Sequence, residues 1–175
     1  MSDKIDVLIS EEEVLKRIQA MGKQISEDYE GKELLLICIL KGSVFFTCDL
    51  AKYITVPVKM DFMAVSSYGS GTESSGEVKI KKDLEESLVG KHVLVIEDII
   101  DSGNTLSRLL KILKMRNPAS IRLCTLLDKP DRRVVDDVEV DYTGFVIPDA
   151  FVVGYGLDYD QKYRNLPYVG VVTLE

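Results

Sequence analysis

Three apolar runs of strand length constrain the fold more than any other feature of the chain. They occupy residues 34–40 (LLLICIL), 92–96 (HVLVI) and 121–127 (IRLCTLL). Near-continuous apolar runs are typical of strands that are buried on both faces, as in parallel sheets covered by helices. Stretches with helical spacing separate these runs, for example residues 44–54 and 105–117. This alternation predicts an α/β fold with a central, mainly parallel sheet flanked by helices.

A first helix is predicted near the start of the chain. Ser10 followed by Glu13 forms a capping-box pattern. The apolar residues that follow recur at spacings of four, three and four, namely Val14, Ile18, Met21 and Ile25. We expect this helix to end near Gly31.

Length, composition and charge narrow the class of protein. With 175 residues, of which 46% are hydrophobic, residues 1–175 are predicted to form one domain. No apolar run is long enough to span a membrane, and no signal peptide is recognisable, so we expect a cytoplasmic protein without a membrane partner. The net charge of -7 argues against a nucleic-acid partner, which usually requires a basic face. A phosphorylated small molecule remains compatible, because backbone N–H groups and a divalent cation can hold phosphate.

Carboxylates and small residues gather where the run at residues 92–96 ends. Glu97, Asp98 and Asp101 come first, and the sequence Ser102-Gly103-Asn104-Thr105 then opens the next predicted helix. The first N–H groups of a helix lack intrahelical partners and can bind phosphate. Carboxylates accept hydrogen bonds or coordinate cations, so they suit sugar hydroxyls or a metal ion. The junction therefore predicts a ligand with a phosphate and a hydroxylated sugar, unless it is merely a capped helix beside solvated acids.

Glu97 and Asp98 are adjacent, which places a condition on this prediction. Consecutive side chains of a strand point to opposite faces. We therefore expect the chain to leave strand geometry at this point, so that both carboxylates can serve one ligand.

Two further segments carry functional predictions. Residues 66–77 (SSYGSGTESSGE) lack an apolar pattern and are either a linker or a lid over an active site. The carboxyl-terminal third is richer in Tyr, Gly and Asp than a packed βα unit, and we expect it to form a small flap or hood.

Polar clusters follow three of the predicted strands, at Lys41-Gly42, at residues 97–105 and at Asp128-Lys129. Ligands of parallel sheets bind at these strand ends.

The junction resembles the phosphoribosyl-pyrophosphate (PRPP) signature of type I phosphoribosyltransferases. The resemblance lies in four apolar residues, Glu-Asp, two apolar residues, Asp-Ser-Gly and a nearby Thr. Other segments fall in the order found in hypoxanthine-guanine phosphoribosyltransferases, and nearly the whole chain resembles their short bacterial form. These segments are Leu40-Lys41-Gly42, Ser67-Tyr68, Asp128-Lys129, Phe151-Val152-Val153-Gly154, and Leu157-Asp158-Tyr159 followed by Arg164.

The resemblance implies a fold, a reaction and a set of partners. The fold is that of type I phosphoribosyltransferases, with a small hood. In the reaction, N9 of hypoxanthine or guanine attacks C1 of PRPP with Mg²⁺ as cofactor, giving IMP or GMP and pyrophosphate. The resemblance also implies a homodimer or homotetramer.

The same resemblance implies roles for individual residues. Glu97 and Asp98 would hold the ribose hydroxyls, with the metal as a second possible ligand, and Asp101 to Thr105 (Asp101, Ser102, Gly103, Asn104, Thr105) would bind the 5-phosphate. Asp101 would also be the catalytic general acid or base. Lys41, Gly42 and Arg164 would contact pyrophosphate. The purine would be bound by Lys129, Phe151, Val152 and Asp158, with Asp158 also at the magnesium ion, and Ser67 and Tyr68 would begin the lid.

Two other functions remain open at this stage. The first is a transferase for another base, xanthine or, less readily, adenine; adenine fits poorly because Lys129 can only donate hydrogen bonds. The second is a regulator of the same fold that senses PRPP or nucleotides, which would need a basic face or an added DNA-binding module. One departure from the family pattern is Asn104, which stands where some members carry lysine.

Overall fold

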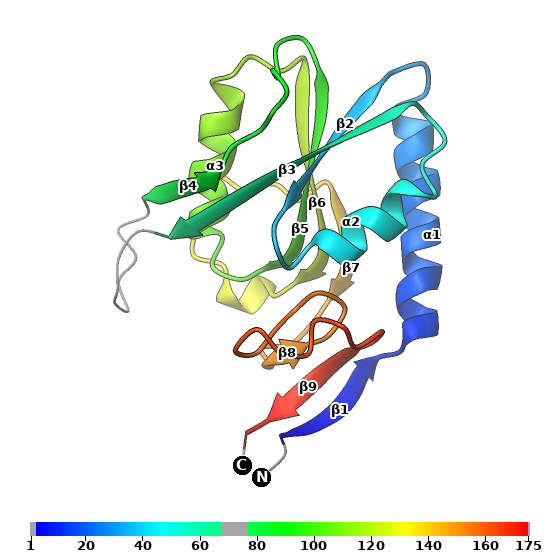
Figure 1. The fold of residues 1–175 in the computed structure, drawn as a ribbon, viewed down its shortest axis with the longest axis vertical. Helices are drawn as coiled ribbons and strands as arrows, with labels where there is room; N and C mark the ends of the chain where they lie inside the picture. Colours follow the sequence, from blue (N-terminus) through cyan, green and yellow to red (C-terminus); the bar gives the residue numbers. More distant parts are fainter. Residues whose placement is uncertain (1–2, 68–76, 175) are drawn as a thin grey trace.

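The computed structural model describes residues 3–67 and 77–174, which form two β-sheets and three α-helices (Figure 1). The strands are β1 (Lys4–Ile9), β2 (Leu34–Ile39), β3 (Val58–Ser67), β4 (Val78–Lys82), β5 (His92–Ile100), β6 (Ser120–Asp128), β7 (Tyr142–Val146), β8 (Val152–Val153) and β9 (Val169–Thr173). The helices are α1 (Glu11–Asp28), α2 (Val44–Ala51) and α3 (Asn104–Lys114), and a short 3₁₀ helix lies at Pro130–Arg132.

The larger sheet confirms the predicted α/β class. Its strand order is β4-β3-β2-β5-β6-β7, and the pairs from β3 to β7 are all parallel. Alternate residues of β2 face two different cores. Leu34 and Leu36 pack with α1 and α2, whereas Leu35 and Ile37 pack with α3. Helices therefore cover both faces of the sheet, which explains why its central strands are apolar at nearly every position (Figure 1).

Helix α1 begins as the capping box predicts. The Ser10 side chain accepts a hydrogen bond from the Glu13 N–H at 3.2 Å. Its buried face carries the residues that recur at helical spacing, Val14, Ile18, Met21 and Ile25. The helix ends at Asp28, and its capping residue is Tyr29, shortly before the predicted end near Gly31.

Strand β4 was not predicted from the sequence. It pairs antiparallel with β3 at the edge of the larger sheet. Its exposed positions include Lys79 and Lys81. Lysines are common on edge strands because they discourage pairing with other chains. Here they alternate with Val78 and Ile80, which is a strand signal that the sequence analysis overlooked. Of the predicted lid, residues 68–76 lie outside the described residues, whereas Ser66 and Ser67 end β3.

The smaller sheet has the order β1-β9-β8. Its strands β8 and β9 come from the carboxyl-terminal segment in which we expected a flap. The third strand, β1, precedes α1 and pairs antiparallel with β9, from Lys4 opposite Thr173 to Ile9 opposite Val169. Figure 1 shows this sheet (blue, orange and red) beyond the carboxyl ends of the larger sheet's central strands.

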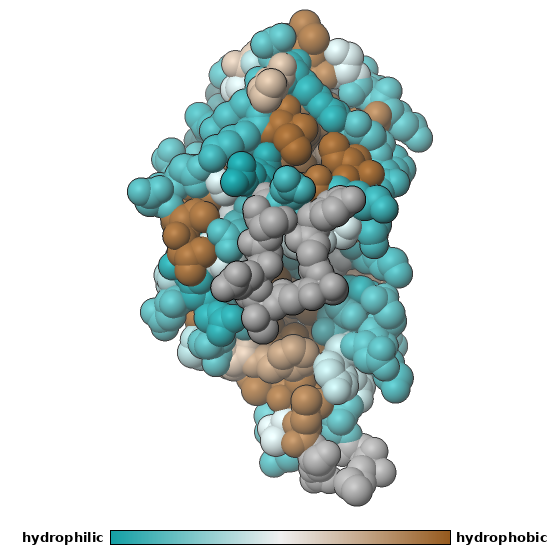
Figure 2. Space-filling model, turned by 90° about the vertical axis from the view of Figure 1, so that its left-hand side faces the viewer, coloured by the Kyte–Doolittle hydropathy of each residue, from teal (hydrophilic) through white to brown (hydrophobic). Residues whose placement is uncertain are grey.

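The surface is largely hydrophilic on the face that Figure 2 shows. The hydrophobic residues on this face form separate patches. None of the helices in the described ranges combines the length and the apolarity that crossing a membrane requires.

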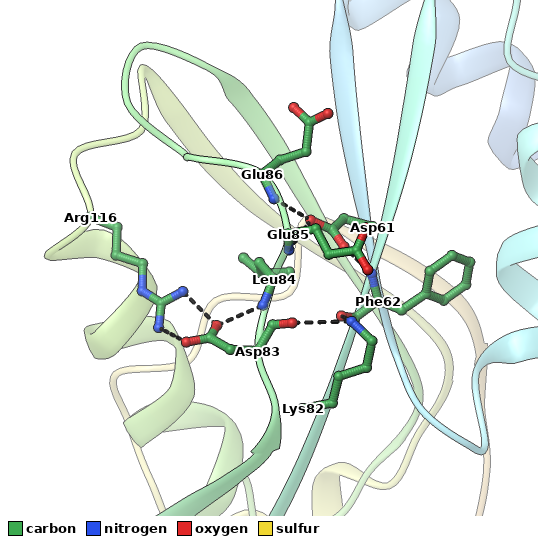
Figure 3. Close-up of polar contacts among 8 residues, drawn as sticks. All are labelled: Asp61, Phe62, Lys82, Asp83, Leu84, Glu85, Glu86 and Arg116. Atoms are coloured by element: carbon green, nitrogen blue, oxygen red, sulfur yellow. Dashed lines mark hydrogen bonds and ion pairs between the residues drawn. The ribbon is translucent and has the colours of Figure 1, made fainter.

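Asp61, a buried carboxylate on β3, hydrogen-bonds to the loop that connects β4 and β5. Asp61 is 4% exposed, and its side chain accepts hydrogen bonds from the N–H groups of Glu85 and Glu86, both at 2.9 Å (Figure 3). It also accepts one from the Phe62 N–H at 2.8 Å. Asp61 thus supplies the acceptors that this irregular backbone lacks.

Replacing Asp61 with alanine is expected to lower the free energy of unfolding by about 3 kcal/mol, because three backbone N–H donors lose a buried carboxylate acceptor. The neighbouring Asp83 is the matched control. Its side chain is 49% exposed and pairs with Arg116 at 2.7 Å (Figure 3). Asp83 also accepts a hydrogen bond from the Leu84 N–H at 2.7 Å. Asp83→Ala should lower the free energy of unfolding by no more than about 1 kcal/mol, since both contacts are exposed to solvent. Urea denaturation measures both, and equal losses would contradict this account.

Candidate active site

A cavity of about 370 Å³ lies at the carboxyl ends of the central strands. Such an edge is where parallel sheets bind ligands. The lining residues come from the end of β2, the end of β5 and the start of α3, and include Ile39, Leu40, Glu97, Asp101, Gly103 and Thr105. Most of the residues predicted at the junction therefore face one cavity.

The turn from Asp101 to Thr105 has the geometry of a phosphate cradle. Gly103 has φ +82° and immediately precedes α3. A Cβ at this position would lie 2.7 Å from Val135 Cγ2, so both conformation and space require glycine. Thr105 Oγ1 lies 2.9 Å from Ser67 Oγ, which places the end of β3 beside the turn. The first N–H groups of α3 have no intrahelical acceptors. The Asn104 N–H donates to Ser102 Oγ at 3.3 Å, and the N–H groups that follow can bind an anion.

Glu97 and Asp98 do not leave strand geometry, so that part of the prediction is wrong. Strand β5 continues to Ile100 and stays in register with β6. The two carboxyl groups are nevertheless close enough to interact: burial, followed by the charge of Asp98, raises the pKa of Glu97 well above its usual range. Burial also raises the pKa of Asp98, against the lowering effects of the Ile99 N–H and the Arg164 charge. A ligand that offers hydroxyl donors or positive charge would relieve this pair.

The loop after β2 and the turn at Gly156 pack closely beside Asp98. The loop after β2 contains a cis peptide between Leu40 and Lys41. A Cβ on Gly42 would overlap the Asp98 carboxylate, and a Cβ on Gly156, where φ is +100°, would overlap the Gly42 carbonyl oxygen. Glycines at both positions therefore allow the loop, the carboxylate and the turn at Gly156 to approach closely.

Two cationic side chains meet at this loop. Lys41 Nζ and Arg164 Nη2 both donate to Gln161 Oε1, at 3.2 and 3.1 Å. Arg164 Nη1 also lies 3.3 Å from Asp158 Oδ1. The sequence analysis did not identify Gln161. It sits in the polar run DYDQKYR, where nothing in the sequence distinguishes it from a solvated residue, and its φ of +65° is visible in the structure alone.

Lys129 lies between two carboxylates. It is 8% exposed, and its Nζ is 3.7 Å from Asp101 Oδ1 and 3.8 Å from Asp149 Oδ1. Arg132 Nη1 is 3.4 Å from the other oxygen of Asp149. The structure thus joins two predicted residues, Lys129 and Asp101, and adds Asp149, which the sequence analysis missed. A buried ammonium held by charge still has N–H donors to offer to a ligand.

Phe151 and Val152 differ in exposure. Phe151 is 50% exposed, and its ring packs edge-on against Tyr159 with centroids 5.6 Å apart. Val152 is buried in β8. The Phe151 ring therefore keeps a face that a planar ligand could stack on. Tyr68, predicted to begin the lid, lies outside the described residues.

The predicted metal residues do not form a complete metal site by themselves. Within residues 3–67 and 77–174, no three His, Cys, Asp or Glu side chains converge in a way that could hold an ion. Asp158 instead pairs with Arg164, and Glu97 and Asp98 interact with each other. Magnesium commonly binds through one or two carboxylates together with substrate phosphates, so this arrangement fits a metal that arrives with its substrate.

Comparisons with known proteins agree with this geometry. Residues 7–160 match the family model described as a phosphoribosyl transferase domain. The chain is 54% identical over 176 residues to a hypoxanthine phosphoribosyltransferase of Salmonella typhimurium, covering 99% of this chain and 98% of the relative. It is 52% identical over 169 residues to a hypoxanthine-guanine phosphoribosyltransferase of Streptococcus thermophilus, covering 97% and 93%.

A solved structure shows the same similarity in three dimensions. The crystal structure of a hypoxanthine-guanine phosphoribosyltransferase from Bacillus anthracis has a TM-score of 0.93 and 48% sequence identity to this chain. The match covers 98% of this chain and 100% of the other.

Proposed function

The chain belongs to the phosphoribosyl transferase family, and we propose that it transfers the phosphoribosyl group of PRPP to hypoxanthine or guanine in purine salvage. The observation that carries this proposal is the cavity at the end of β5, where a phosphate cradle adjoins a carboxylate pair. The products are IMP or GMP and pyrophosphate.

The charges around the cavity suit this reaction. The turn from Asp101 to Thr105 binds the 5-phosphate through backbone N–H groups and hydroxyls. Glu97 and Asp98 accept hydrogen bonds from the ribose hydroxyls, and their negative charge favours the positive centre that develops at C1. Lys41 and Arg164, held together at Gln161, receive the leaving pyrophosphate. The substrate thus needs anionic and cationic groups at separate points, and the structure provides both.

Recognition of the base rests on Lys129 and its neighbours. The Lys129 ammonium donates to the 6-oxygen of the purine, while Phe151 stacks on the ring and the Val152 backbone contacts its edge. Asp101 lies 3.7 Å from Lys129, so a base held by Lys129 also lies near Asp101. We assign to Asp101 the proton exchange at N7, as general acid or base.

The donor set fits magnesium bound together with PRPP. Burial raises the pKa values of Glu97 and Asp98, so a cation beside them would stabilise their charged forms. We propose that these residues and Asp158 hold the metal with the substrate oxygens. When bound, the ion neutralises charge on the leaving pyrophosphate.

Further features of the enzyme are proposed on the same basis. Residues 1–175 act as one catalytic domain, with residues 66–77 as its lid and the smaller sheet as its hood. We also propose that it works in the cytoplasm as a homodimer or homotetramer.

A PRPP- and magnesium-dependent assay over four purine bases tests the proposal, with pyrophosphate release as the readout. Hypoxanthine or guanine should be used at least about 100-fold more efficiently than adenine, because Lys129 cannot accept a hydrogen bond from a 6-amino group. Chelation of the metal should abolish turnover. Preferred use of adenine would refute the role of Lys129 in binding the 6-oxygen. Preferred use of xanthine would show that the base is xanthine and not hypoxanthine or guanine. Tight, salt-sensitive binding to nucleic acid without turnover would instead indicate a regulator.

A further inference from the structure

We propose that Gln161 is a positioning residue that holds Lys41 and Arg164 in place to receive the pyrophosphate group. This inference rests on the proposed function and deepens it. None of the sequence patterns discussed above includes Gln161.

The geometry shows one neutral oxygen between two cations. Gln161 Oε1 lies 3.2 Å from Lys41 Nζ and 3.1 Å from Arg164 Nη2. An amide oxygen has two lone pairs, so it can accept from both donors at once. Because its acceptor carries no charge, Gln161 itself neutralises neither cation, although Asp158 also pairs with Arg164.

The two cations depend on Gln161 to different degrees. Arg164 has other anchors, since its Nη1 donates to the Gly156 carbonyl at 2.7 Å and lies 3.3 Å from Asp158. For Lys41, Gln161 is the sole hydrogen-bond partner of the ammonium among the residues that the structure describes. Lys41 is exposed, and a free lysine side chain samples many rotamers. Gln161 therefore determines where the Lys41 charge is held.

The backbone around Gln161 is arranged to direct this side chain. Asp160, Gln161 and Tyr163 all have positive φ, at +50°, +65° and +75°. Such conformations are costly for residues other than glycine, and they concentrate at functional sites. Two contacts hold the segment in this shape: the Gln161 N–H donates to Asp158 Oδ2 at 2.9 Å, and the Tyr163 hydroxyl donates to Asp3 at 2.6 Å.

The three side chains also share a space that can admit a ligand. Lys41, Gln161 and Arg164 line a cavity of about 660 Å³. A pyrophosphate group that enters this cavity meets the Lys41 ammonium and the Arg164 guanidinium, which already lie close together. Preorganisation of this kind increases affinity, because the ordering cost is met before binding.

The experiment replaces Gln161 with methionine, which has nearly the same shape and no strong acceptor. We expect the KM for PRPP and the Kd of magnesium pyrophosphate, measured by calorimetry, to rise about tenfold, the equivalent of one lost charge-assisted hydrogen bond. The KM for hypoxanthine should change less than about twofold, because Lys129 and Phe151 are untouched. Gln161→Glu keeps an oxygen that both cations can reach but adds a negative charge beside them, so it should weaken pyrophosphate binding about as much as Gln161→Met or more.

Gln24→Met is the matched control, because Gln24 is exposed on α1, an element that contributes no residue to this cavity. It should leave every constant unchanged. The inference is overturned if Gln161→Met binds pyrophosphate like wild type, or if it weakens PRPP and hypoxanthine equally while lowering Tm, which would indicate a structural role. Wild-type protein that neither turns over PRPP nor binds pyrophosphate would overturn the proposed function itself, and the inference with it.

Discussion

Replacing Asp101 with asparagine is expected to lower kcat by about 10² to 10⁴-fold while the KM for PRPP changes less than about threefold. Asparagine keeps the shape of the side chain and removes its capacity to exchange a proton. In the proposed phosphate site Asp101 contributes only its backbone N–H, which asparagine keeps, and the hydroxyls come from Ser102 and Thr105, so we expect PRPP binding to survive. Steady-state kinetics with PRPP and hypoxanthine separate the two constants.

Asp149→Asn is the matched control for this prediction. Asp149 is the other carboxylate beside Lys129, at 3.8 Å compared with 3.7 Å for Asp101. Removing its charge should weaken binding of the base through Lys129 and reduce kcat far less than Asp101→Asn does. If Asp101→Asn reduced kcat and PRPP binding by the same factor, the role in proton exchange would be wrong.

Gly156→Ala is expected to reduce kcat/KM for PRPP by about 100-fold or more, because small displacements of reacting groups have effects of this size. The new methyl group would overlap the Gly42 carbonyl oxygen, and Gly42 in turn lies against the Asp98 carboxylate. The substitution therefore displaces the loop at Gly42, the Asp98 carboxylate or both. The effect should exceed what backbone strain alone produces.

Gly90→Ala is the control variant, because it introduces backbone strain without a steric overlap. Gly90 also has positive φ, at +72°, but no atom lies within 4 Å of the position that its Cβ would occupy. Both variants pay a conformational penalty of about 1 kcal/mol, which urea denaturation records. Full activity of Gly156→Ala, or equal losses of activity in both variants, would show that the close approach at Gly42 has no functional consequence.

The sequence predicted those parts of the fold whose signals are local. The apolar runs of β2, β5 and β6 report burial on both faces, and the capping pattern at Ser10 marks the start of α1, because adjacent residues determine both features. The turn at Gly103 is likewise a local feature, since its small residues and the helix that follows are contiguous in the chain.

Other features depend on contacts between distant residues. Gln161 meets Lys41 across 120 positions of sequence, and Asp149 meets Lys129 only after the chain has passed through β7. Such pairs have no one-dimensional signature. The interaction of the adjacent Glu97 and Asp98 within an intact strand was unexpected for another reason, because alternation predicts opposite faces. Strand β4 was overlooked although Val78 and Ile80 alternate with lysines.

The pairing of β1 with β9 has a consequence for how the protein is made. During translation β1 leaves the ribosome early and has no partner until β9 has been synthesised, whereas β2, β5 and α3 are complete before that. Closing so large a loop is slow relative to local contacts. The larger sheet and α3 can thus form while β8, which carries Val152, still lacks its partner β9. We expect the smaller sheet to be the last part of the fold to form, once β9 has been synthesised.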